Sequence, residues 1–335
     1  MPFSRRDLGR LALAGLPAVL LRPATAQAGL LQTGKPDSRW AGVQVGMNVP
    51  YNFGGRQMPK DDILARCVKL GVSAVELRAQ PVETFLGVPV LPEGAKAAPD
   101  EGVEGGLLEL EQEVLQESLE LAKKSFAAGL RSWRASVDLA PLAAFRQQYE
   151  EAGVRIEILK WDDLGRMSDE EVDYAFRVSR ALGARALSTE ISAEGPRRLG
   201  PAAEKHGLFV GFHGHASTGA AAFEEAFGHG KFNGANLDIG HWVAGGHGSP
   251  LPFLQKHTGR ITHIHVKDRK ANNGPNTPFG EGDTPIREVL QAMRDNKWPF
   301  QATIEFEYPV PPGSDRMTEL ARALAYCRSC LITGL

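Results

Sequence analysis

Four short apolar stretches of this sequence each end in a side chain that can bind a metal ion. The stretches end at Glu190, Asp238, His265 and Glu305. Each predicts a buried strand, and in a parallel (β/α) barrel the carboxyl ends of the strands converge on one face. Two glutamates, one aspartate and one histidine form a mixed oxygen and nitrogen set that suits a divalent cation. We therefore predict that these four residues bind one divalent metal ion, which is Mn, Co, Mg or Zn.

Further polar side chains lie beside these ligands. Strand alternation puts His263, His265 and Lys267 on one face. Two histidines and a lysine on one strand face are hard to satisfy without a ligand, so Lys267 is predicted to be catalytic. The residues predicted to bind substrate are His213, His215, His241, Lys160, Glu76 and Arg269. His241 follows Asp238 by three residues, and either a metal ligand or a substrate contact fits its position.

The elements that position these residues are short β-rich runs that alternate with helices. Glycines such as Gly71 end the predicted helices. The predicted strands cover residues 43–48, 73–77 and 154–159 and then end at Glu190, His213, Asp238, His265 and Glu305. Eight strands alternating with helices predict an α/β protein with a (β/α)8 TIM barrel, since eight strands close such a barrel.

One segment, residues 81–140, interrupts the alternation. It begins with a loop rich in proline and glycine over residues 81–106 and continues with a helical stretch over residues 107–128. We interpret it as an elaborated connection between the second strand and the second helix. The alternative is an extra short strand over residues 130–137, which would be a ninth strand and would break the count of eight.

The N-terminal segment is typical of an export signal. Two arginines at positions 5 and 6 precede an apolar run over residues 11–21, and an A-x-A sequence ends at residue 28. These are the features of a twin-arginine signal, and the run is too short to anchor the protein in a bilayer. The predicted organisation is an export signal over residues 1–28, a linker over 29–42 and a single barrel domain over 43–335. We expect the mature protein in the periplasm or outside the cell, with no membrane association.

Charge and cysteine content narrow the function classes. The chain has 38 basic and 40 acidic residues, and loss of residues 1–28, with four arginines and one aspartate, leaves a formal charge of −5. An acidic protein without a basic cluster is a poor binder of nucleic acid, so no nucleic-acid partner is expected.

Cys327 and Cys330 have a C-x-x-C spacing, for which thiols or a local disulfide in a terminal helix is favoured over a redox or zinc site.

The order of these motifs resembles the xylose isomerase-like barrel superfamily, often called sugar phosphate isomerase/epimerase. The resemblance rests on the sequences Asp-Ile-Gly-His at 238–241, His-Val-Lys-Asp at 265–268 and Gly-Glu-Gly-Asp at 280–283, and it covers roughly residues 43–330. The sequence Phe-His-Gly-His at 212–215 is similar to the inosose dehydratase branch of that superfamily.

The resemblance implies roles for individual residues. In ketose epimerases of the superfamily, two Glu, one Asp and one His bind the metal, which implies the same four ligands here. The two glutamates, Glu190 and Glu305, would also act as the acid and base on the two sides of the sugar. Members of the family often form dimers, which implies a homodimer here. The resemblance also implies that the substrate is a small carbohydrate.

These residues leave more than one function open. The leading hypothesis is an isomerase or epimerase that acts through an enediolate on a keto-sugar or related polyol. The first alternative is a metal-dependent lyase or hydratase of the dehydratase type that acts on a 3-keto-sugar or keto-glycoside. A DNA-repair endonuclease shares this barrel, but the acidic charge disfavours it. The last alternative is a sugar-binding barrel without catalytic activity.

Overall fold

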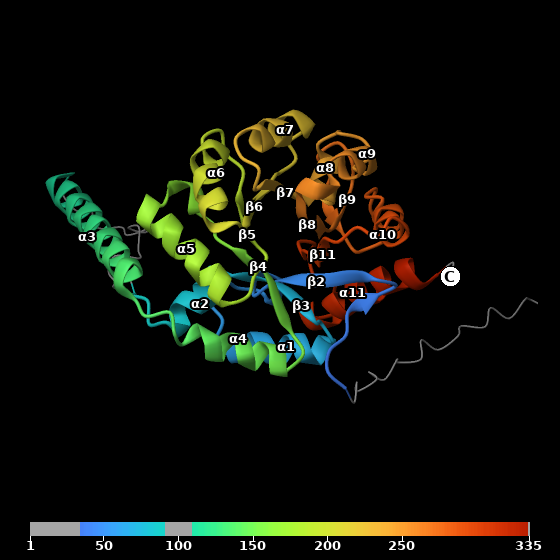
Figure 1. Ribbon diagram of the computed structural model, residues 1–335, viewed down its shortest axis with the longest axis horizontal. Helices are drawn as coiled ribbons and strands as arrows, with labels where there is room; N and C mark the ends of the chain where they lie inside the picture. The colour runs from blue at the N-terminus through green and yellow to red at the C-terminus, as the bar shows by residue number, and fades with distance from the viewer. Residues whose placement is uncertain (1–33, 91–108, 334–335) are drawn as a thin grey trace, which may run out of the picture. The chain divides into compact units, whose positions relative to one another are not determined.

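Eight parallel strands form a closed barrel, as predicted (Figure 1). The computed structural model describes residues 34–90 and 109–333, so the predicted export signal lies outside the described residues. The barrel strands are β2 (Val43–Val49), β3 (Ala74–Arg78), β4 (Arg155–Lys160), β5 (Ala186–Glu190), β6 (Phe209–His213), β7 (Asn233–Asp238), β8 (Ile261–Val266) and β11 (Gln301–Ile304). Each pairs in parallel with the next, and β11 pairs with β2 to close the barrel. The (β/α)8 TIM barrel is therefore confirmed.

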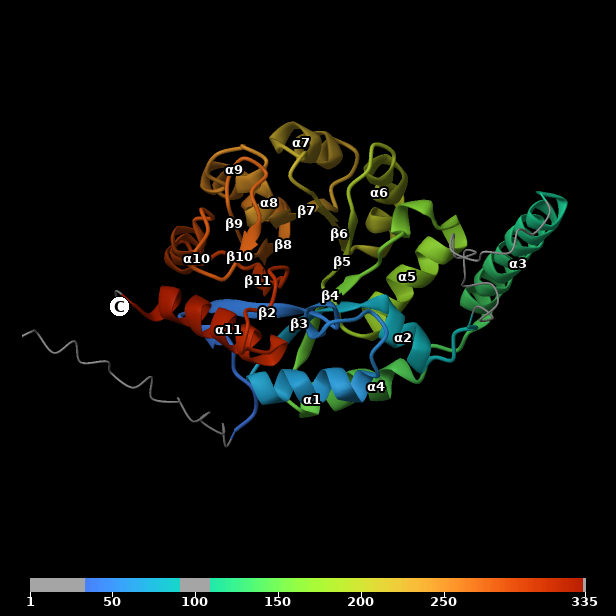
Figure 2. The same cartoon turned by 180° about the vertical axis from the view of Figure 1, so that it is seen from behind.

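Helices surround the strands, as Figure 2 shows from the opposite side. The α-helices are α1 (Lys60–Leu70), α2 (Ala79–Phe85), α3 (Glu109–Ser136), α4 (Leu142–Glu151), α5 (Asp169–Ala181), α6 (Gly195–His206), α7 (Ala220–Gly228), α8 (Ile239–Ala244), α9 (Leu251–Lys256), α10 (Ile286–Asp295) and α11 (Arg316–Ile332). The 3₁₀-helices in the described part of the chain are η1 (Tyr51–Phe53), η3 (Leu164–Arg166) and η4 (Thr258–Arg260). Two short strands, β9 (Asp268–Arg269) and β10 (Asn276–Thr277), pair antiparallel in the connection that follows β8.

The sequence explains where these elements begin and end. Every residue of β2, β3, β7, β8 and β11 is buried, because helices cover the barrel outside and side chains fill its interior. The side chain of Ser168 accepts from the backbone N–H of Glu171, whose side chain accepts from Ser168 in turn, and this capping box starts α5. Gly71 ends α1 with a φ of 74°, a conformation that glycine adopts without strain.

The folded sheet begins earlier than predicted. Arg39 and Trp40 form a short strand, β1, that pairs antiparallel with Gln44 and Val43 of β2. The buried hydroxyl of Ser38 donates to the carbonyl of Val45 at 2.6 Å. The predicted linker over residues 29–42 is therefore wrong over its last residues, because these backbone and side-chain bonds attach them to the barrel.

The excursion after the second barrel strand is helical. Helix α3 continues to Ser136, so the alternative of a strand over residues 130–137 is wrong, and the predicted end of the helix at residue 128 is too early. In both views α3 lies outside the ring of helices, beside α5 (Figures 1 and 2). Its last turn is held by Arg134, which donates to Glu83 at 2.8 Å and to Glu171 at 2.9 Å. Much of the proline- and glycine-rich loop lies outside the described residues.

No helix within residues 34–90 and 109–333 has the length and apolar character needed to cross a membrane.

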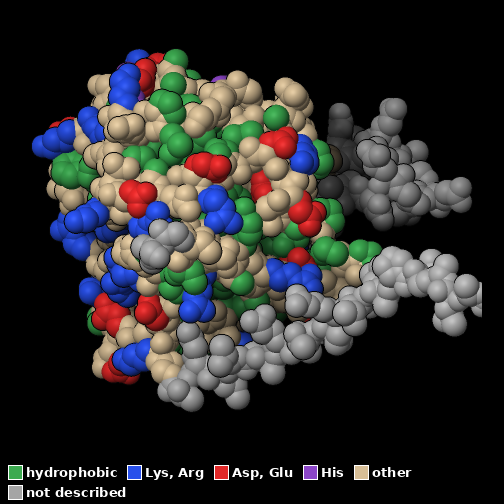
Figure 3. All heavy atoms as spheres, turned by 90° about the vertical axis from the view of Figure 1, so that its right-hand side faces the viewer, with side chains coloured by type: hydrophobic (Ala, Val, Ile, Leu, Met, Phe, Trp, Pro, Cys, Tyr) green, Lys and Arg blue, Asp and Glu red, His purple; other side chains and the backbone are tan. Residues whose placement is uncertain are grey.

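On the face drawn in Figure 3, basic and acidic side chains are interspersed with scattered hydrophobic ones. Interspersed charges of both signs produce no strong field of a single sign over that face.

Candidate active site

The register of the barrel brings the chemically active side chains to the carboxyl ends of neighbouring strands. His213 pairs with Asn236 across β6 and β7, and Asp238 pairs with His265 across β7 and β8. Glu305 follows the last residue of β11, whose neighbour is β8. This is the end of a (β/α)8 barrel at which catalytic residues are found.

Four buried side chains from these adjacent strands form one cluster that can hold a metal ion. His213, Asp238, His265 and Glu305 each offer a ligand atom, and these atoms all lie within 4.8 Å of one another. Three of the four predicted ligands, Asp238, His265 and Glu305, are therefore brought together. The fourth member of the cluster is His213, which was predicted to bind substrate, and Glu190 is not part of it.

The donor atoms of this cluster fit a divalent cation. Nδ1 of His213, Oδ2 of Asp238 and Nδ1 of His265 are buried and have no hydrogen-bond partner among the described residues. Oε2 of Glu305 lies 3.2 Å from Nδ1 of His265, an ionic contact without hydrogen-bond geometry. Burial lowers the pKa of His213 well below its usual value, so its imidazole is neutral, as a ligand must be. A set of two imidazoles and two carboxylates suits Mn, Co or Zn better than it suits Mg, because Mg prefers ligand sets made of oxygen alone.

Glu190 has other partners, one strand away from the cluster. Lys160 donates to its Oε1 at 2.5 Å, and Nε2 of His215 lies 2.9 Å from its Oε2. Burial raises the pKa of Glu190, but the His215 hydrogen bond and the Lys160 charge outweigh burial and hold the pKa at about 2. The same hydrogen bond raises the pKa of His215. Glu190 thus orients the exposed ring of His215 at the mouth of the barrel.

Lys267 lies among the carboxylates of the cluster. Its Nζ is 2.8 Å from Oε2 of Glu305, 3.0 Å from Oδ2 of Asp238 and 2.7 Å from Oε2 of Glu307. Burial disfavours the ammonium, but these three negative charges outweigh burial and raise the pKa of Lys267. Lys267 is therefore a fixed positive charge beside the two carboxylate ligands, rather than a lysine that loses its proton near neutral pH.

Glu76 lies beneath the cluster, in the barrel interior. Its fully buried carboxylate is 2.5 Å from Nε2 of His265 and 3.3 Å from Nε2 of His263. Burial raises the pKa of Glu76, but the two imidazoles outweigh burial and hold the pKa well below its usual value. A carboxylate that holds one ring nitrogen of a histidine fixes the orientation of the other nitrogen toward a metal. The structure thus places Glu76 behind His265, whereas the sequence predicted a substrate contact.

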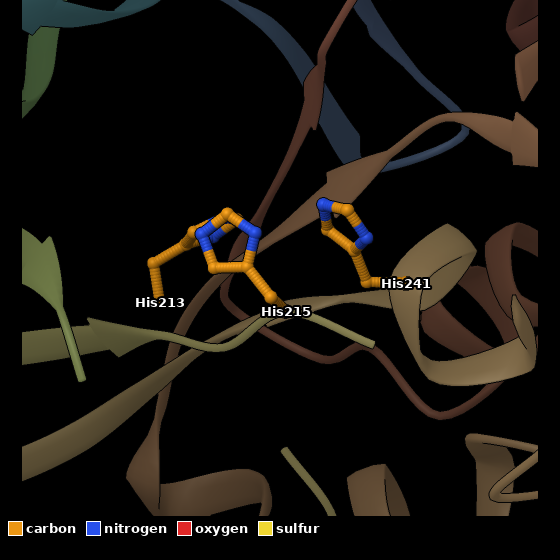
Figure 4. A group of neighbouring side chains, drawn as sticks. All are labelled: His213, His215 and His241. Carbon is orange, nitrogen blue, oxygen red and sulfur yellow. The ribbon is translucent and has the colours of Figure 1, made fainter. Parts of the chain in front are cut away.

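Three imidazoles lie together here, the buried ring of His213 and the more accessible rings of His215 and His241 (Figure 4). The ring centroids of His213 and His215 are 5.0 Å apart, and those of His215 and His241 are 4.8 Å apart. His241 lies between two cations, with its Nε2 3.0 Å from Lys267 and its Nδ1 2.7 Å from Arg269. Burial and the Lys267 charge lower the pKa of His241 to about 3, so His241 is a neutral hydrogen-bonding group.

Several residues that our sequence interpretation missed complete the site. Asn48, at the end of the first barrel strand, donates to Oε1 of Glu305 at 3.0 Å. Tyr51 donates to Oε1 of Glu307 at 3.0 Å. Asp268 accepts from the backbone N–H groups of residues 280, 282 and 284, which fixes the loop after β10 to the chain that follows Lys267. The position of Asn48, a polar residue at a strand end, is the signal that would have indicated it.

Comparisons with known proteins agree with this architecture. The model of the xylose isomerase-like TIM barrel family matches residues 64–330. An inosose dehydratase of Clostridium beijerinckii is 32% identical over 140 residues, which cover 35% of this chain and 47% of that protein. One of Lactiplantibacillus plantarum is 28% identical over 162 residues, which cover 42% of this chain and 53% of that protein. The chain thus spans about half the length of these curated relatives.

Solved structures share the fold at low sequence identity. A D-psicose 3-epimerase from Clostridium cellulolyticum aligns with a TM-score of 0.58 and 11% identity, over 86% of this chain and 99% of that one. A probable 3-DHS dehydratase from Bacillus anthracis aligns with a TM-score of 0.55 and 13% identity, over 84% and 98%. The closed eight-stranded barrel and the family match over most of the sequence lead to one conclusion: this chain belongs to the xylose isomerase-like TIM barrel family.

Proposed function

We propose that this chain is a metal-dependent carbon–oxygen lyase of the dehydratase type that acts on a keto-sugar or related keto-polyol. The observation that carries the proposal is the buried cluster of His213, Asp238, His265 and Glu305 beside the His215–Glu190 pair. The cluster supplies metal ligands, and the pair supplies a group for proton transfer. The inosose dehydratases among the relatives support this reaction class, although each match covers only about half of the relative.

Each part of the site has a role in such an elimination. A divalent ion held by the four ligands would polarise the substrate carbonyl and stabilise negative charge on its oxygen. His215, oriented by Glu190, accepts the proton on the carbon next to the carbonyl. The C–H electron pair forms the new double bond while the C–O bond at the next carbon breaks, and the leaving oxygen takes up the proton. Lys267 adds a fixed positive charge to the same face.

Two properties of the carboxylates favour elimination over epimerisation. Epimerisation through Glu190 and Glu305 needs both to exchange protons from the two sides of one carbon. Glu190 is engaged by Lys160 and His215, with a pKa of about 2. Burial raises the pKa of Glu305, but the charges of His265 and Lys267 outweigh burial and hold it well below its usual value. Both are therefore weak bases. An isomerase or epimerase is the second candidate, because both carboxylates do line the site.

Product analysis tests the proposal. The protein, loaded in turn with Mn, Co, Zn and Mg, is incubated with an inosose, 3-ketoglucose and a 3-keto-glycoside, and the products are analysed by mass spectrometry. Loss of one water, or release of the alcohol of the glycoside, is the expected result. A product of unchanged mass and altered stereochemistry would favour the second candidate. No conversion of any of these substrates with any of the metals would contradict both.

A matched pair of variants tests the role of His215. His257 also has its Nε2 2.9 Å from a glutamate, Glu224, but it lies outside the site. His215→Gln is expected to lower kcat by about 10²–10⁴-fold, the usual contribution of a general acid or base. His257→Gln is expected to leave kcat unchanged. Equal activities of the two variants would exclude His215 from proton transfer.

A further inference from the structure

A cavity opens beside the cluster, at the same end of the barrel. Its volume is about 460 Å³, within the range of small-molecule sites. The loops after β2, β8 and β11 form it, and β2 and β11 are neighbours in the barrel (Figure 2). The lining side chains that matter here are Tyr51, Asn276, Phe306, Glu307, Tyr308 and Arg316. None of the roles assigned above accounts for this space.

Glu307 belongs both to the cavity and to the surroundings of the metal cluster. One of its carboxylate oxygens accepts from Lys267 at 2.7 Å, and the other accepts from Tyr51 at 3.0 Å. Glu305, a cluster member, is only two residues away, and two residues of extended chain span at most about 7 Å. The cluster and the cavity are therefore adjacent, since Lys267 bonds both to Glu305 of the cluster and to Glu307 of the cavity wall.

The chemistry of the lining fits a sugar ring. Asn276 Oδ1 is a buried acceptor with no partner among the described residues. The guanidinium of Arg316 has five N–H donors, one of which bonds to the carbonyl of Asn52. It forms no ion pair with any residue of the described chain. Its guanidinium lies 4.8 Å from the centre of the Phe306 ring. Aromatic walls with a few polar groups that donate and accept are suited to hydroxyls around an apolar ring.

We propose that this cavity is the subsite for the second ring of a glycosidically linked substrate, so that the enzyme acts on keto-glycosides in preference to free keto-monosaccharides. The inference rests on the function proposed above for the neighbouring cluster. The reacting ring occupies the cluster, and the second ring occupies the cavity against Tyr51 and Arg316. Glu307 lies between the two rings.

Gly55 is a position at which the edge of this cavity can be narrowed without disturbing the fold. It lines the cavity, its φ is not positive, and a Cβ built on it meets no heavy atom within 4 Å. Gly55→Leu therefore adds a side chain at the edge of the cavity without a clash with the backbone. Gly259, in η4 before β8, is also exposed and open to a Cβ, and it lies at the opposite end of the barrel. Gly259→Leu is the matched control.

The test compares kcat/KM for the 3-keto derivatives of maltose, lactose, cellobiose and trehalose with that for 3-ketoglucose. For the wild type, at least one keto-disaccharide is expected to exceed 3-ketoglucose by about tenfold, the effect of one or two additional hydrogen bonds. Gly55→Leu is expected to lower that ratio by about tenfold, and Gly259→Leu to leave it unchanged. A wild type that prefers 3-ketoglucose, or a ratio unaffected by Gly55→Leu, would overturn the subsite.

Calorimetric binding of the same compounds separates failure of the subsite from failure of the proposed function. If the wild type converts none of them but binds a keto-disaccharide more tightly than Gly55→Leu does, the subsite stands and the reaction is wrong. If wild type and Gly55→Leu bind every keto-disaccharide equally, or neither binds any, the subsite is overturned.

Discussion

The ammonium of Lys267 and the carboxylate of Glu305 form a buried ion pair of 2.8 Å inside the candidate metal site. Asp238 and Glu307 surround the same ammonium at 3.0 and 2.7 Å. The positive charge of Lys267 therefore compensates the negative charge of Asp238 and Glu305, the same two carboxylates that would bind a metal ion. We therefore expect the stability of the protein and its affinity for metal to be coupled through this side chain.

Lys267→Met tests that coupling. Removal of one partner of a buried ion pair costs about 3–5 kcal/mol, because the remaining charge is left unpaired. We expect the metal-free variant to lose about this much free energy of unfolding, and Mn²⁺ to restore most of it. Thermal unfolding with and without Mn²⁺ is the measurement. Lys256→Met, which removes an exposed partner of Glu224, is the control. A metal-free Lys267→Met protein as stable as the wild type would contradict the prediction.

Glu76→Gln tests the orientation of His265. Loss of a partner that orients a metal-binding histidine typically costs about 10–100-fold in metal affinity. We expect the Kd for Co²⁺ to rise by this factor, as measured by calorimetry, while the barrel still folds. Glu224→Gln alters a glutamate–histidine pair outside the site and is expected to leave the Kd unchanged. Equal Kd values for Glu76→Gln and wild type would show that Glu76 does not position the ligand.

Metal affinity is expected to rise with pH. Burial lowers the pKa of His265, but the charges of Glu305 and Glu76 outweigh burial and raise the pKa to about 10 in the metal-free protein. Below that pH the imidazole carries a proton that a metal ion must displace. The Kd for Mn²⁺ is therefore expected to fall by about tenfold for each pH unit between pH 6 and 8. A Kd that is the same at pH 7 and 8 would contradict this prediction, because it would mean that no ligand loses a proton when the metal binds.

Arg134→Met tests the attachment of α3. Arg134 is buried and pairs with both Glu83 and Glu171, which join α3 to α2 and α5. Its loss leaves two buried carboxylates without a cation, at a cost of about 3 kcal/mol in free energy of unfolding. Chemical denaturation measures this cost, with Arg131→Met, an exposed arginine of the same helix, as the control. A change of the same small size in both variants would show that the network does not hold α3.

The strands of the barrel were predictable from the sequence, because a buried strand in a parallel sheet is a short, largely apolar run between two helices. Every barrel strand after the first follows a helix, and most of the barrel strands are short, largely apolar runs. The short run over residues 130–137 was ambiguous, because a run of this length has no periodicity that separates a strand from a helix. The ion pairs of Arg134 that hold the end of α3 connect distant residues, which sequence patterns do not reveal.

The fourth ligand was harder to predict than the other three. Glu190 and His213 both end barrel strands, and residue type alone favoured the glutamate. Strand order decides between them, because β6 lies between β5 and β7 and places His213 nearer to Asp238. The cluster comes from four consecutive neighbours in the barrel, β6, β7, β8 and β11. The requirement that all four ligands lie on neighbouring strands would therefore have indicated His213.

The most direct test of the central claim is the metal content of the purified wild type and of His213→Ala and Glu190→Gln. The structure predicts about one divalent ion per chain in the wild type and in Glu190→Gln, and loss of most of it in His213→Ala. Loss in Glu190→Gln with retention in His213→Ala would restore the ligand set predicted from the sequence. A wild type that binds none of Mn, Co, Zn and Mg when each is offered would contradict the metal site itself.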